Sequence, residues 1–161
     1  MVRAALEDLA GQLAAPKFKG STTALTKVAK AILEAARRQD SAAYVRHDIK
    51  FHRLIVEGAS NRILLRTWES LAFEVRLQLW LSRGKTDLVH VQEEHWNIIA
   101  ALENGDGRQA GELLRKHVFD FIHSHSPQLP QIKDNPLNGR SVQTGTKPLY
   151  KKKMPTLTGK D

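Results

Sequence analysis

The sequence contains no cysteine, so neither disulfide bonds nor thiolate metal ligands are available to it. It also lacks any apolar run approaching the roughly 20 residues that a membrane-spanning helix needs. Near the N-terminus, Glu7 and Asp8 stand where a signal peptide would have its apolar core. These absences argue against a secreted or membrane protein, and we expect a cytoplasmic one.

The net charge of +8 suggests a nucleic-acid partner at first, but the charge is unevenly distributed. Residues 133–161 hold seven Lys or Arg against two Asp, whereas residues 1–132 hold 18 basic and 15 acidic residues. Five of the six prolines also lie beyond residue 126. We therefore predict one domain over residues 1–125 and a mobile, Pro/Lys-rich basic tail over residues 126–161.

Sustained strand-like alternation is absent, and apolar residues recur at spacings of three and four through residues 1–125. Capping residues, glycines and prolines divide this part into about six helices, near residues 2–15, 22–38, 41–57, 62–82, 86–104 and 106–125. The first is expected to end at Pro16, and Asn61 is expected to cap the fourth. The apolar face of the first helix is predicted from Val2, Leu6, Leu9 and Leu13. The pattern predicts an all-α fold, an antiparallel bundle of about six helices.

Four residues with metal-binding side chains fall on inward faces of these helices. Asp48 and His52 are four residues apart, so they project from one helix face about one turn apart. His95 and His117 lie among apolar residues of the last two predicted helices. One carboxylate and three imidazoles suit zinc, nickel, manganese, cobalt or ferrous iron rather than calcium. Spacing alone leaves a second interpretation open, in which each histidine is a hydrogen-bonded core residue without a metal.

Two stretches resemble the signature motifs of the FCD domain, the C-terminal effector-binding domain of GntR-family, FadR-subgroup bacterial transcription regulators. The first is Asp48–Ile55 followed by Ala59–Leu64; the second is Glu94–Asp106 followed by Ala110, Leu113, Leu114 and His117. Residues 2–7 also resemble the helix that opens this domain, so the resemblance covers about residues 2–125. It implies that one divalent transition metal ion per chain (Zn, Ni, Mn, Co or Fe) is bound in the bundle core by Asp48, His52, His95 and His117.

The resemblance further implies a homodimeric sensor of a small organic acid, whose binding changes the affinity of the dimer for DNA. Arg76 is the candidate for holding the far carboxylate of that acid; the alternative is a surface arginine with a buried stem. Trp68 and Trp80 are expected either in the core or at the dimer interface. In the family a winged helix-turn-helix domain precedes this domain. It is missing from the sequence, so we expect DNA contact only through such a domain.

Two other functions stay open from the sequence. A metalloenzyme could use an Asp/His3 site to activate water, although no general base is evident. Glu57, Glu93 and Glu94 are the possible bases, but Glu93 and Glu94 neighbour His95 on a different helical phase and are expected to face solvent. The second alternative is a stand-alone dimerisation partner of full-length regulators. We expect a sensor that is not an enzyme.

Overall fold

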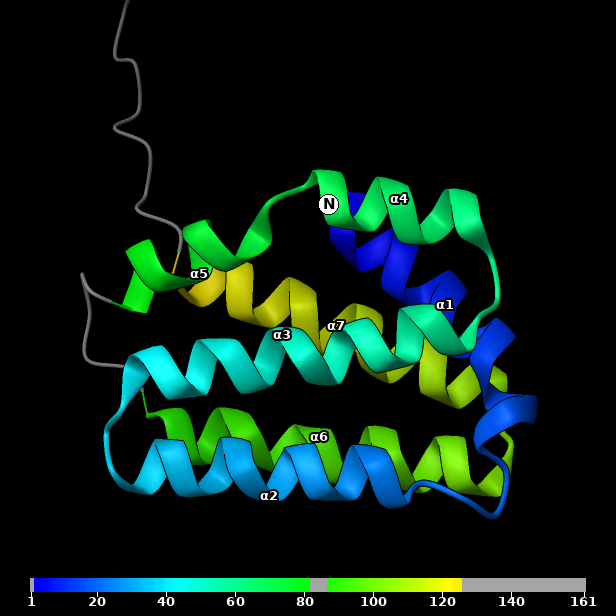
Figure 1. Ribbon diagram of the computed structural model, residues 1–161, viewed down its shortest axis with the longest axis horizontal. Coiled ribbons are helices and arrows are strands. Elements are labelled where there is room, and N and C mark those ends of the chain that lie inside the picture. Colours follow the sequence, from blue (N-terminus) through cyan, green and yellow to red (C-terminus); the bar gives the residue numbers. More distant parts are fainter. Residues whose placement is uncertain (1, 82–86, 126–161) are drawn as a thin grey trace, which may run out of the picture. The chain divides into compact units, whose positions relative to one another are not determined.

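The structure, a computed structural model, describes residues 2–81 and 87–125. These residues form seven helices and no strand: α1 (Val2–Phe18), α2 (Thr23–Arg37), α3 (Ser41–Gly58), α4 (Arg62–Ser70), α5 (Phe73–Leu81), α6 (Leu88–Asn104) and α7 (Gly107–His125). Helices α1, α2, α3, α6 and α7 pack as a bundle, while α4 and α5 lie against α3 (Figure 1). The predicted all-α bundle is confirmed. None of the described helices has the length and apolar character needed to cross a membrane.

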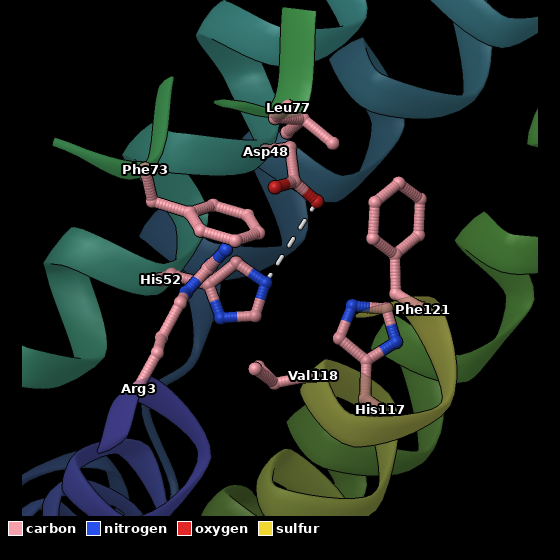
Figure 2. A pocket seen from close by; sticks show the side chains of 8 residues that line it. All are labelled: Arg3, Asp48, His52, Phe73, Leu77, His117, Val118 and Phe121. Carbon is pink, nitrogen blue, oxygen red and sulfur yellow. Dashed lines mark ion pairs between the residues drawn. The ribbon is translucent and has the colours of Figure 1, made fainter. Parts of the chain in front are cut away.

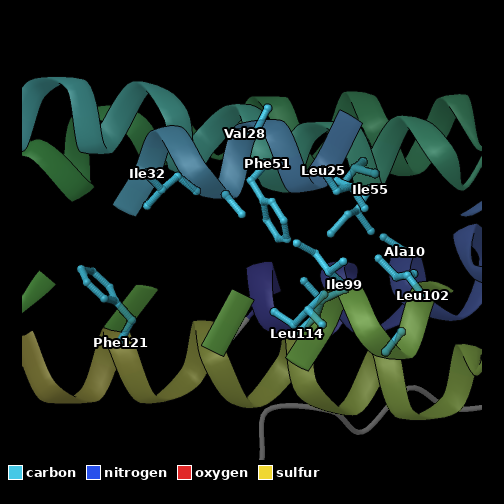
Figure 3. Packing of buried hydrophobic residues seen from close by; sticks show 14 of the residues in the cluster. Ala10, Leu25, Val28, Ile32, Phe51, Ile55, Ile99, Leu102, Leu114 and Phe121 are labelled. Atoms are coloured by element: carbon cyan, nitrogen blue, oxygen red, sulfur yellow. The ribbon is translucent and has the colours of Figure 1, made fainter. Parts of the chain in front are cut away.

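The hydrophobic core lies between α2 and α3 on one side and α6 and α7 on the other (Figure 3). Leu25, Phe51, Leu102 and Leu114 are all completely buried there. Burying such a side chain contributes roughly 1.5–3 kcal/mol relative to leaving it in water. Since Phe51 stands next to His52 on α3, this core fixes the position of the helix face that carries the candidate metal site.

Helices α1 and α7 approach each other closely because glycines line their contact. A Cβ atom built on Gly11 would lie 2.8 Å from the backbone nitrogen of Gly111. A Cβ atom on Gly111 would lie 2.6 Å from the carbonyl oxygen of Asp8. Both distances are shorter than real Cβ contacts allow, so only glycine permits this approach. The approach brings α1 directly against the helix that carries His117.

The predicted apolar face of α1 is wrong. Val2, Leu9 and Leu13 are 59%, 43% and 44% exposed. The buried face instead combines small residues with two charged ones, Arg3, Ala4, Glu7, Ala10, Gly11, Ala14 and Ala15, and ends at Phe18. Large side chains do not fit where α1 meets α7, so the leucine stripe turns outward and only Leu6 packs partly against the core.

The end predicted for α1 at Pro16 is also wrong, because the helix continues through Pro16 to Phe18. Pro16 lies in the last turn, where it removes a single backbone donor. The amide of Lys19 still donates to the carbonyl oxygen of Ala15 at 3.0 Å, and Phe18 is buried against the core. Tertiary packing therefore carries the helix past its proline.

The fourth predicted helix is divided into α4 and α5. The chain turns at Leu71 and Ala72, and Ala72 adopts a left-handed conformation with φ +46°. Neither proline nor glycine marks this break in the sequence. At its other end α4 is capped as predicted, since Asn61 accepts from the amides of Ile63 and Leu64 at 3.1 Å. The break gives α5 its own direction, with Phe73 and Leu77 on its buried side.

Candidate metal centre

The structure brings the four predicted site residues together. Asp48 and His52 come from α3, His95 from α6 and His117 from α7, and all are at most 5% exposed. One nitrogen or oxygen from each residue lies within 4.8 Å of those of the other three. The imidazole rings of His52 and His117 are stacked, with centroids 5.3 Å apart, and the rings of Phe51 and His95 pack nearly at right angles, with centroids 4.6 Å apart. Three helices and a buried aromatic ring therefore define the cluster.

In His52 and His95 the ring nitrogen that faces Asp48 is Nε2. Nε2 of His95 is 3.3 Å from Oδ1 of Asp48, and Nε2 of His52 is 3.7 Å from the same oxygen. Nε2 of His95 is buried without a hydrogen-bond partner among the described residues. A buried polar atom in this state is costly unless a cation or a proton compensates it.

The other ring nitrogen of each histidine has its own acceptor. Nδ1 of His52 donates to Oε2 of Glu7, and Nδ1 of His117 donates to Oε2 of Glu94 at 2.7 Å. Nδ1 of His95 donates to the backbone oxygen of Gln92 at 3.1 Å. A carboxylate or carbonyl oxygen can only accept, so each Nδ1 carries the proton in a neutral ring. Each Nε2 then presents its lone pair, as a metal-ligating histidine requires.

Glu7, which the sequence did not single out, is 1% exposed and holds three donors from three helices. Its Oε1 accepts from Nε of Arg3 at 2.5 Å and from Nε1 of Trp68 at 2.8 Å, and its Oε2 accepts from His52. Burial by itself raises the pKa of this carboxyl, but Arg3 and His52 outweigh it and lower the pKa to about 2. Glu7 is therefore a buried, ionised carboxylate. Trp68 is buried, in agreement with the core alternative for this residue.

Burial and neighbouring charges determine the protonation states of two cluster residues. Burial raises the pKa of Asp48, but His52 and His95 outweigh this and hold the pKa of the carboxyl well below its usual range. Burial lowers the pKa of His117 to about 4. At neutral pH the centre thus holds an anionic carboxylate and a neutral imidazole, which are the protonation states that bind a cation.

The expectation that Glu93 and Glu94 face solvent is confirmed for Glu93, whose side chain is 67% exposed, but holds only in part for Glu94. Its side chain is 38% exposed, and its carboxylate reaches across from α6 to His117 on α7. The hydrogen bond from His117 lowers the pKa of Glu94. A flexible side chain at the edge of the inward face can make this contact although its Cα lies off that face.

A pocket opens beside the cluster (Figure 2). Its described lining residues are Arg3, Asp48, His52, Phe73, Leu77, His117, Val118 and Phe121. Arg3 is 5% exposed, and its guanidinium lies 3.6 Å from the ring centroid of Phe73. Its Nε is held by Glu7, while one terminal nitrogen, Nη2, is buried without a hydrogen-bond partner among the described residues. The pocket lining therefore combines a carboxylate, two imidazoles and an incompletely paired cation.

Arg76, the predicted effector contact, lies on α5, but its side chain falls outside the residues whose side chains are described. The same holds for Trp80. Arg3 was missed because an arginine near the N-terminus is ordinarily exposed. The signal that could have found it is its spacing, since Arg3 and Glu7 form an i,i+4 pair on the helix.

Comparison with known proteins agrees with this architecture. A family model described as FCD domain matches residues 1–120. The chain is 33% identical over 121 residues to a protein of Paenarthrobacter nicotinovorans named as a probable D-xylose utilization operon transcriptional repressor. That alignment covers 75% of the chain and 54% of the relative, so the chain spans about half the length of the curated relative it matches. No solved structure is significantly similar to the chain.

Proposed function

The chain belongs to the FCD domain family of GntR-type transcription regulators, and from this premise we propose that residues 1–125 sense a small organic acid through a bound metal ion. The proposed ligands are Asp48, His52, His95 and His117. Residues 126–161, for which the sequence predicts a mobile tail, lie outside the described residues. DNA contact is assigned to another domain of the intact regulator, of the winged helix type that the family resemblance implies.

One observation carries the metal assignment. All three imidazoles have Nδ1 occupied by an acceptor, and Nε2 of His52 and Nε2 of His95 are both directed toward one carboxylate oxygen of Asp48. If the rings are neutral, lone pairs face lone pairs at this point, which is unfavourable in a buried site without a positive charge between them. Nitrogen and oxygen donors of this kind fit a divalent transition metal of the zinc, nickel, manganese, cobalt or iron type.

Features of the pocket support the proposed class of ligand. A bound metal ion would supply positive charge and free coordination positions for an anionic ligand. Arg3 supplies a second positive charge, which is buried, and its Nη2 makes no hydrogen bond among the described residues, so it can donate to a ligand. Phe73, Leu77 and Val118 contribute apolar walls. Two cationic points between apolar walls favour a small acid with a carboxylate and a short carbon skeleton.

Calorimetric titration of the zinc-loaded protein with a panel of hydroxy acids, dicarboxylic acids and sugar acids tests this assignment. We expect one class to bind and to raise the thermal midpoint. Arg3→Met should abolish most of that affinity, and Arg3→Lys should weaken it, because lysine keeps the charge but loses the planar fork. Arg66→Met, at an exposed position of α4, is the matched control and should bind as the wild type does. A panel without any binder would contradict the sensing role.

We also propose that two copies of the domain pair through the outer face of α1. Val2, Leu9 and Leu13 place large apolar side chains on this exposed face, and Ile63 of the neighbouring α4 is 79% exposed. Sedimentation analysis should give a dimer for the wild type and a monomer for the Leu9→Glu, Leu13→Glu double variant. A wild-type monomer at high concentration would contradict the pairing.

A hydrolytic enzyme would need a general base at the pocket. Asp48 is the one carboxylate among the described residues that line it. The two nearby glutamates, Glu7 and Glu94, are each hydrogen-bonded to a histidine of the cluster. The geometry therefore favours a sensor over a metalloenzyme.

A further inference from the structure

Glu7 stands out because it belongs to neither the proposed ligand set nor the pocket lining. It is nonetheless 1% exposed, which is costly for a carboxylate unless every oxygen is well paired. Three donors compensate it: Arg3 on its own helix, His52 on α3 and Trp68 on α4. A carboxylate held this firmly makes a fixed acceptor for the imidazole of His52.

We propose that Glu7 is a positioning residue of the metal site, a role that rests on the proposed function. By accepting from Nδ1 of His52, Glu7 keeps the proton on that nitrogen and leaves the Nε2 lone pair directed at the centre. Asp48 would otherwise compete for the same proton, since its Oδ1 lies 3.7 Å from Nε2 of His52. A proton on Nε2 would block the ligand position. Arg3 and Trp68 hold the carboxylate in place for this task.

Replacement of Glu7 by glutamine changes the hydrogen-bond chemistry while keeping the shape of the side chain. In the wild type Oε1 of Glu7 accepts hydrogen bonds from Arg3 and Trp68, and Oε2 accepts one from His52. Glutamine has one acceptor oxygen and one donating NH2 group. If the glutamine oxygen retains the hydrogen bonds from Arg3 and Trp68, its NH2 group faces Nδ1 of His52. Nδ1 must then become an acceptor. The ring proton moves to Nε2.

Long-range ¹H–¹⁵N NMR of the metal-free protein, at about pH 8 where histidines are ordinarily neutral, reads this tautomer directly. We expect the Nδ1–H form of His52 in the wild type and the Nε2–H form in Glu7→Gln. The wild-type spectrum needs no variant, so it decides the matter even if Glu7→Gln fails to fold. An Nε2–H tautomer in the wild type, or an unchanged tautomer in a folded Glu7→Gln protein, would overturn the assignment.

Zinc affinity, measured by competition with a chromophoric chelator, provides the second readout. Glu7→Gln should weaken Zn²⁺ binding about 10- to 100-fold, the usual loss when the partner of a ligating histidine is removed. Glu112→Gln, the same replacement at an exposed position of α7, is the matched control and should keep the tautomer and the affinity. Equal losses in both variants, or none in Glu7→Gln, would refute the role of Glu7. Absence of Zn²⁺ binding by the wild type would instead refute the proposed metal site, and the tautomer would still be judged separately.

Discussion

Substitution of Gly111 by alanine tests the packing that places α1 beside the metal centre. The new Cβ atom would lie 2.4 Å from Oδ1 of Asp8 and 2.6 Å from its carbonyl oxygen. The side-chain oxygen can rotate away, but the carbonyl belongs to the backbone of α1. Ordinary contact begins near 3.4 Å, so the two helices must separate locally by about 0.8 Å.

Two opposing effects set the magnitude of this change. Alanine is favoured over glycine in a helix interior by about 1 kcal/mol. Overpacking that shifts backbone costs typically about 1–3 kcal/mol. Because the clash at Asp8 involves backbone, we place its cost at about 2 kcal/mol and expect Gly111→Ala to lower the free energy of unfolding by about 1 kcal/mol. That corresponds to roughly 3–6 °C in the thermal midpoint of a domain of this size.

Urea denaturation of the metal-free protein, followed by circular dichroism, measures the difference. Arg115→Ala, at an exposed position of α7, is the control and should change the free energy of unfolding by less than about 0.5 kcal/mol. The sign for Gly111→Ala decides between the two effects. A gain of about 1 kcal/mol, as helix propensity alone would give, would refute close contact between α1 and α7.

Three further changes have definite expected outcomes. The metal-free protein should lose stability on acidification, because burial lowers the pKa of His117 from 6.5 to about 4. Between these two pH values the unfolded chain binds a proton that the folded protein does not, so the free energy of unfolding falls by up to about 3 kcal/mol as the pH drops from 6.5 to 4. Urea midpoints against pH will show this, and a His117→Gln variant should flatten the curve in that window; an unchanged slope would contradict a buried neutral His117. Ala72→Gly should raise the thermal midpoint, because glycine adopts φ +46° without the strain of roughly 1 kcal/mol that alanine bears there; a lower midpoint would contradict the strained turn. Asn61→Ala should cost about 1 kcal/mol in urea unfolding through loss of the α4 cap while leaving zinc affinity unchanged; full stability would show that the cap contributes nothing.

The positions of most helices and the grouping of the four candidate ligands could be predicted from the sequence, because both depend on spacing. A carboxylate and an imidazole four residues apart share a helix face whatever the rest of the chain does. His95 and His117 each lie among large apolar residues, so their inward direction was also visible in the pattern. The structure brings all four together in the core, at the place where spacing and apolar pattern put them.

The environment of the centre was not predictable in the same way. On α1 the large apolar residues Leu9 and Leu13 point outward, whereas Arg3 and Glu7 are buried. Hydrophobic periodicity predicts that the face with the most hydrophobic residues is buried. It therefore misses the face of α1 that packs against α7, where burial depends on small residues that fit between two backbones. A charged pair is assigned to the surface by default, and only its partners on other helices reveal that it is buried.

The division of the predicted 62–82 helix had a similar cause. Its apolar residues keep helical spacing across Leu71 and Ala72, and no local signal interrupts them. The interruption is caused by tertiary packing. It allows Phe73 and Leu77 to line the pocket beside Asp48, which a straight continuation of α4 would not. Local propensity gives way here to the gain from burying these side chains.

Metal analysis of the protein purified without chelators tests the central claim most directly. We expect close to one transition metal ion per chain in the wild type and in the control His90→Ala, since the side chain of His90 is 81% exposed. It predicts none in the Asp48→Ala, His117→Ala double variant, provided that circular dichroism shows the helices intact. A folded double variant that retains one ion per chain, or a wild type that binds no ion even after incubation with zinc, would contradict the account.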